Sequence, residues 1–75
     1  MSEKESKILR TIIALAYNKE STETYTTADL LSSINHNLTG VRQMYLGTKF
    51  YYYVIKRPSK FEIIRSTGNN KYRTR

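Results

Sequence analysis

The stretch Tyr25–Gln43, YTTADLLSSINHNLTGVRQ, contains two helix starts separated by a turn, and it decides the fold. Thr26 and Asp29 have the T-x-x-D spacing of a capping box, in which two side chains satisfy free backbone N–H groups at a helix start. Tyr25 precedes this cap and Leu30 stands at the fourth helical position, which is the arrangement of a hydrophobic staple. The stretch therefore predicts that a helix begins here.

This helix is predicted to be short, over residues 27–34, because apolar residues continue at helical spacing only that far: Leu30, Leu31 and Ile34. Asn35-His36-Asn37 follows as a turn, since asparagine tolerates left-handed backbone angles. Leu38-Thr39 then repeats the order of an apolar residue and a cap, which predicts the start of a third helix. We interpret His36 as a turn residue rather than a metal ligand, because the chain has no second His and no Cys.

The third helix is predicted over residues 39–55. One helical face collects the residues at spacings of 3, 4, 3 and 4, namely Arg42, Tyr45, Lys49, Tyr52 and Lys56. The other side, predicted to pack inward, collects Met44, Gly47, Tyr51, Val54 and Ile55. Pro58 disfavours helical angles at Arg57, so the helix should end by that point. The alternative is a helix that ends near Gly47 and is followed by a strand over residues 50–55.

The segments on either side complete an α+β pattern. Ser2 and Glu5 have the S-x-x-E form of a capping box, and the apolar residues behind them predict an amphipathic helix over residues 3–18. Residues 61–75 predict a β-hairpin, because two alternating segments flank the tight-turn sequence Gly68-Asn69-Asn70. The hairpin side chains expected to face the core are Phe61, Ile63 and Tyr72, and those expected to project outward are Arg65, Lys71, Arg73 and Arg75.

Length and composition limit the functions that the chain can have. Seventy-five residues make a single domain, 1–75, whose thin core leaves little room for a deep catalytic pocket. Without Cys there is no disulfide and no thiolate metal site, and no spacing suggests a catalytic triad or a phosphate-binding loop. No apolar run approaches the ~20 residues of a membrane span. We therefore expect a cytoplasmic protein with no catalytic residues, no metal and no cofactor.

Charge is sorted along the chain. Residues 39–75 carry nine Lys or Arg against the single acid Glu62, whereas residues 1–38 carry four against five acids. A region of one charge sign favours a polyanionic partner. Five of the seven tyrosines lie in the basic half, and basic groups mixed with aromatics are typical of nucleic-acid surfaces. About two of Tyr45, Tyr51, Tyr52 and Tyr53 are expected to be buried, Tyr51 first.

The order of helix, short helix, turn, basic helix and basic hairpin resembles the winged helix-turn-helix family of DNA-binding proteins. The resemblance covers about residues 8–74 and rests on the two caps, the turn and the hairpin. It implies three helices followed by a C-terminal β-hairpin wing, with double-stranded DNA as the partner. The turn departs from the commonest pattern because it has no glycine. The small size, the lack of Cys and the Ile/Tyr/Lys-rich composition are also similar to small regulators of archaeal viruses and plasmids.

The resemblance implies a set of contact residues. In the third helix, which would enter the major groove, these are Thr39, Arg42, Gln43, Tyr45, Lys49, Tyr52 and Tyr53. Arg42 can offer a planar fork to guanine, and Gln43 can pair bidentately with adenine. In the wing, which would lie on the backbone or in the minor groove, they are Arg65, Asn69, Asn70, Lys71 and Arg73.

Two other functions stay open. The chain could bind RNA or single strands in general, with the tyrosines as stacking platforms. It could also be a protein-interaction module whose aromatic cluster buries against a partner helix. Proteins with a helix-turn-helix often bind palindromes as dimers, so a homodimer is a further expectation.

Overall fold

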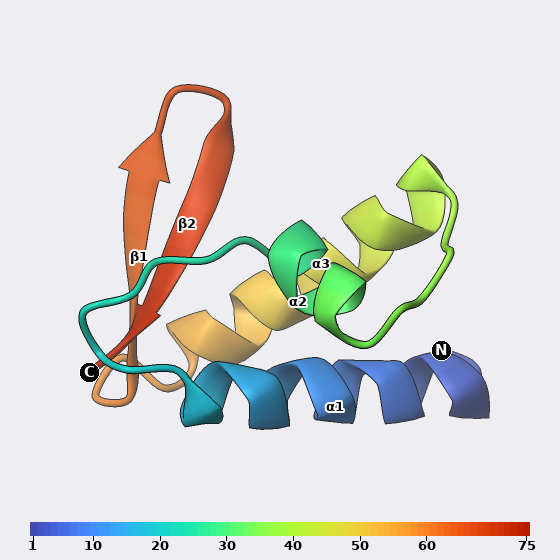
Figure 1. Cartoon of the computed structure of the whole chain (residues 1–75), viewed down its shortest axis with the longest axis horizontal. Helices are drawn as coiled ribbons and strands as arrows, with labels where there is room; N and C mark the ends of the chain where they lie inside the picture. The colour runs from blue at the N-terminus through green and yellow to red at the C-terminus, as the bar shows by residue number, and fades with distance from the viewer.

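The computed structural model describes all residues, 1–75, as three helices followed by a two-stranded antiparallel sheet. The elements are α1 (Glu3–Asn18), α2 (Thr27–Ser33), α3 (Gly40–Ile55), β1 (Phe61–Ser66) and β2 (Asn69–Thr74). In Figure 1, α1 lies along one side of the molecule, α2 and α3 pack on it, and the hairpin stands at the end of α1 where that helix finishes. This is the predicted α+β layout of a winged helix-turn-helix domain.

The helix starts are those that the caps predicted. The side chains of Ser2, Thr26 and Thr39 each accept a hydrogen bond from the backbone N–H three residues later. Only Thr26 forms a complete reciprocal box, because Asp29 in turn accepts from the Thr26 N–H at 2.9 Å. The predicted turn is also confirmed, since Asn35 adopts a left-handed φ of 54° directly after α2. Local chemistry therefore fixes the beginning of each helix.

The helix α3 is continuous through Gly47, so the alternative of a helix end at that position followed by a strand is wrong. The reason is that Leu46, Phe50 and Val54 repeat every four residues and are all buried. They form the inner face of α3. The prediction that Met44 and Ile55 pack inward is wrong, because these side chains are 74% and 46% exposed.

Eleven buried side chains form the core, which α1, α2, α3 and both strands share. Its members are Ile8, Ile12, Ala16, Tyr25, Leu30, Leu31, Leu46, Phe50, Val54, Phe61 and Tyr72. Aromatic rings join the hairpin to α3, as Phe50 meets Tyr72 edge-on with ring centroids 4.8 Å apart. None of the three helices is both long and apolar enough to cross a membrane.

The wing, residues 61–74, is tied to the helices by an additional bridge. Tyr25, in the loop before α2, exchanges two backbone hydrogen bonds with Tyr72 of β2, at 2.8 and 3.0 Å. Within the hairpin the register pairs Ser66 with Asn69, so the turn is shorter than predicted and is made by Thr67 and Gly68. Gly68 takes a φ of 86°, which only glycine adopts easily.

Candidate functional site

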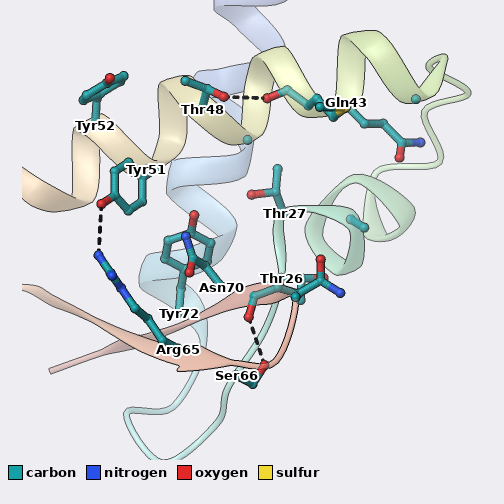
Figure 2. Close-up of a pocket in the computed structure, with 16 residues that line it drawn as sticks. Thr26, Thr27, Gln43, Thr48, Tyr51, Tyr52, Arg65, Ser66, Asn70 and Tyr72 are labelled. Carbon is teal, nitrogen blue, oxygen red and sulfur yellow. Dashed lines mark hydrogen bonds between the residues drawn. The ribbon is translucent and has the colours of Figure 1, made fainter.

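An open groove lies between the wing and α3, and the start of α2 lies between its two walls (Figure 2). The α3 wall is formed by Gln43, Met44, Gly47, Thr48, Tyr51 and Tyr52. The wing wall is formed by Arg65, Ser66, Gly68, Asn69, Asn70 and Tyr72. The rest of the lining comes from Thr26, Thr27, Ala28 and Gly40. Apolar groups and uncharged polar side chains share the lining, Arg65 is its one charged residue, and the groove is open to solvent.

One polar contact joins the two walls. The guanidinium Nη2 of Arg65 donates to the hydroxyl of Tyr51 at 3.4 Å, which Figure 2 shows as a dashed line. Tyr51 is half-buried, and its ring meets Tyr52 edge-on at 5.8 Å between centroids. Arg65 is exposed and has no acidic partner, so its charge is available at the rim of the groove.

The predicted basic face of α3 exists but lies beside the groove, on the flank nearer α1. The guanidinium Nη1 of Arg42 forms an ion pair with Glu5 of α1 at 3.3 Å, although the Arg42 side chain is still 58% exposed. The ammonium of Lys49 lies 5.5 Å from the ring centre of Tyr45. Lys56 is exposed. These cations can reach a polyanion alongside α3 but do not line the groove.

Two predicted contact residues of α3 already have partners within the protein. Gln43 is half-buried, and its Nε2 donates to the carbonyl of Leu38 at 3.1 Å, so bidentate pairing with adenine would require this bond to break. Tyr53 lies away from the groove, where its hydroxyl is 3.4 Å from that of Tyr17 and its ring packs on Phe61. Burial and the Tyr17 hydroxyl raise the pKa of Tyr53.

None of the four clustered tyrosines is fully buried, which corrects the expectation that about two would be. Tyr45, Tyr51 and Tyr53 are half-buried and pack against the core, whereas Tyr52 is 57% exposed at the rim of the groove. The buried rings are instead Tyr25 and Tyr72. Burial raises the pKa of Tyr72, whose ring is part of the wing wall of the groove.

The predicted wing residues lie on two different faces of the hairpin. Arg65 pairs with Asn70 in the register and both line the groove. Lys71 and Arg73 belong to pairs that face the other way, because neighbouring residues of a strand alternate. Lys71 is exposed, whereas Arg73 forms an ion pair with the carboxylate of Glu62. The outer end of the wing therefore carries Arg65, Asn69, Asn70 and Lys71, without Arg73.

The N-terminus of α3 also borders the groove, because Gly40 in its first turn is part of the lining. Thr39 is exposed and its hydroxyl accepts from the Arg42 N–H at 3.4 Å. The first turn of α3 contains no acidic residue, whereas α1 and α2 begin with acids. The partial positive charge of this helix end is therefore not neutralised locally, which favours an anion there. No group of three His, Asp or Glu side chains that could hold a metal ion occurs in the structure.

A row of outward-facing side chains on α3 was not predicted from the sequence. Val41, Met44 and Thr48 are exposed, and none of them was among the predicted contact residues. Their place on a second apolar stripe of the helix was visible in the sequence, but spacing alone did not tell which of the two stripes faces the core.

Comparison with known proteins bears on the fold. No family model and no curated protein matches this chain. The solved structure of the protein named "SCCmec type IV LP1413 - nucleic acids binding protein" is similar, with a TM-score of 0.81. The two chains are 24% identical, and the match covers 97% of this chain and 88% of that chain. At this identity the likeness shows a shared fold.

Proposed function

We propose that this protein binds double-stranded DNA in a sequence-specific manner and acts as a transcription regulator. In this proposal α3 enters the major groove, and the wing lies on the backbone or in the minor groove. One observation carries it: the exposed face of α3 and the outer end of the wing border the same open groove, with cations on both sides. That the similar structure is named as a nucleic acids binding protein supports the same class of partner.

The cations have a specific place in this proposal. Arg42, Lys49 and Lys56 would lie against one phosphate strand, and Arg65 with Lys71 against the other. The start of α3, with Thr39, would receive a further phosphate. The proposal is of an intracellular binding protein and not of an enzyme, and a homodimer on a palindromic site is compatible with it.

The test is a selection of bound sequences from a random duplex pool, followed by anisotropy titrations of the recovered sequence and a scrambled duplex. We expect tighter binding to the recovered sequence, and a slope of log K against log salt of about −0.9 for each phosphate neutralised. Lys71→Ala should weaken binding to both duplexes equally and make this slope shallower by about 1. Equal affinity for both duplexes, or no binding near physiological salt, would contradict the proposal.

A second candidate is general binding of RNA or single-stranded DNA. It is favoured by the edge-on pair Tyr51 and Tyr52, of which Tyr52 is exposed enough to stack on a base. Competition separates the two functions. If single strands displace a labelled duplex as well as unlabelled duplex does, and Tyr52→Ala weakens binding more than Lys71→Ala, the second candidate replaces the first.

A further inference from the structure

The outward stripe of α3 is apolar. We define it as Val41, Met44, Thr48, Tyr52 and Ile55, which share one side of the helix. Four of the six large hydrophobic side chains exposed in the whole protein belong to it, with exposed fractions from 46% to 75%. The Thr48 hydroxyl donates to the Met44 carbonyl at 2.9 Å, so its hydrogen-bonding group is satisfied within the helix. A continuous exposed apolar stripe of this kind marks an interaction surface.

The side chains that could donate hydrogen bonds to bases lie off this stripe. The Gln43 amide donates to Leu38, and the Arg42 guanidinium is paired with Glu5. On the stripe itself, the Tyr52 hydroxyl is the only side-chain group with a free donor. The outer face of α3 is therefore poorly equipped to distinguish bases by hydrogen bonding, and apolar contact is what it offers.

Charge indicates what covers the stripe. Cations border it on both sides, with Lys49 and Lys56 on the α1 flank and Arg65 across the groove. A second copy of this chain, with a net charge of +7, would bring like charges together along both borders. The DNA major groove has the complementary form: it is wide enough for a helix, phosphates line its two edges, and the C5-methyl group of thymine is the apolar group on its base edges.

We infer that the stripe of α3 contacts thymine C5-methyl groups, so that the protein selects its DNA site through the positions of these methyl groups. Val41, Met44 and Thr48 are the contacting residues, because they are the three residues of the stripe nearest the N-terminus of α3, the end that a recognition helix presents to base edges. This inference rests on the proposed binding of duplex DNA and adds the substrate class, an A·T-rich duplex whose thymines face this helix.

The test uses one A·T-rich duplex, taken from the selection above and synthesised with either thymine or uracil. Uracil keeps the base-pairing edge and lacks only the C5-methyl group. We expect the uracil duplex to bind more weakly, by about fourfold for each methyl group contacted. A G·C-rich duplex in which 5-methylcytosine replaces cytosine should bind more tightly than its unmethylated form.

Variants show whether the stripe is responsible for the difference in binding between the thymine and uracil duplexes. In Val41→Ala/Met44→Ala the preference for the thymine duplex over the uracil duplex should shrink, because only Thr48 of the three contacting residues remains, and both substitutions are at exposed positions that the core does not use. Lys71→Ala is the matched control, which should weaken binding to both duplexes and keep their ratio.

Three results would overturn the inference and leave the proposed function standing. These are equal binding of the two duplexes by the wild type, an unchanged ratio in the double variant, or a dimer in sedimentation that Met44→Ala dissociates. Failure to bind any duplex would instead overturn the proposed function.

Discussion

The two faces of α3 are made of similar residues but have opposite surroundings. On the inner face Leu46, Phe50 and Val54 are 2% exposed or less, and on the outer face Val41 and Met44 are about three-quarters exposed. Apolar character alone therefore does not show which side of this helix meets the core. One face of α3 therefore holds the fold together, and the other is free for a partner.

The largest effect should come from Phe50, whose ring contacts those of Phe61 and Tyr72 in the core. Phe50→Ala should lower the free energy of unfolding by about 3–5 kcal/mol, because it removes buried surface and leaves a cavity. Met44→Ala, on the outer face, should change it by less than about 0.5 kcal/mol. Urea unfolding curves measure both. A loss for Met44→Ala close to that of Phe50→Ala would erase the distinction between the faces.

The second prediction concerns the pH dependence of stability, which the buried side chain of Tyr25 should affect. Burial raises the pKa of Tyr25 to about 12 from its ordinary value of 10. The folded state thus keeps this proton after the unfolded state has lost it, so stability is complete below pH 10 and falls between pH 10 and 12. The loss should be about 2–3 kcal/mol.

The control for this pH effect is Tyr25→Phe. The Tyr25 hydroxyl is buried and has no hydrogen-bond partner, so the substitution should cost little at pH 7. Unfolding curves from pH 9 to 12 should fall less steeply for the variant than for the wild type. Parallel curves would show that burial of this hydroxyl contributes nothing in that range.

The two arginines of the wing, Arg65 and Arg73, should contribute differently to duplex binding. Arg65→Ala should weaken duplex binding and make the salt slope shallower by about 1, because Arg65 has no acidic partner at the rim of the groove. Arg73→Ala should change binding little, since its charge is already paired with Glu62 on the other face. Anisotropy titrations at several salt concentrations measure both. The reverse order of effects would mean that the part of the wing around Arg73, and not its outer end, meets DNA.

The ion pair between Glu5 and Arg42 permits a variant that should strengthen duplex binding instead of weakening it. Glu5→Gln should strengthen duplex binding modestly, because it releases Arg42 from its ion pair and removes a negative charge near the DNA. Arg10→Ala, on the exposed side of α1 opposite its buried residues, is the matched charge control and should leave binding unchanged. A loss of affinity for Arg10→Ala as large as the gain for Glu5→Gln would point to net charge rather than placement.

The smallest effect is expected at Gly47, at the border between the two faces. A Cβ atom added there would lie 3.8 Å from the Thr27 Oγ1, which is ordinary van der Waals contact. Gly47→Ala should therefore stabilise the protein by about 0.5–1 kcal/mol through helix propensity. A lowered urea midpoint would show that α2 needs the missing side chain for its approach to α3.

Features that depend on short-range chemistry were predictable from the sequence. The caps at Ser2, Thr26 and Thr39 involve residues three apart, so the three helix starts and the turn at Asn35 follow from local patterns. The β-hairpin was predicted from the alternation of its two segments and from Gly68 between them. These features together determine the fold class.

What could not be predicted depends on contacts between distant residues. The inner face of α3 was mistaken because Met44 and Leu46 are both apolar, and only packing against the other elements distinguishes them. The bridge between Tyr25 and Tyr72 has no local signal. The pairing of Arg73 with Glu62 depends on the hairpin register, which the shorter turn sets.

A map of the backbone amide chemical shifts of the protein, recorded while a selected duplex is added, shows which surface of the protein meets the DNA. If the outer face of α3 does, the shifted amides should lie in two groups, the first half of α3 with Thr39 and the end of the wing around Arg65–Lys71. The chemical shifts of the α1 amides around Arg10 should not change. Shifts concentrated on α1, or a protein that binds the duplex without perturbing α3, would contradict the claim that the outer face of α3 is the nucleic-acid surface.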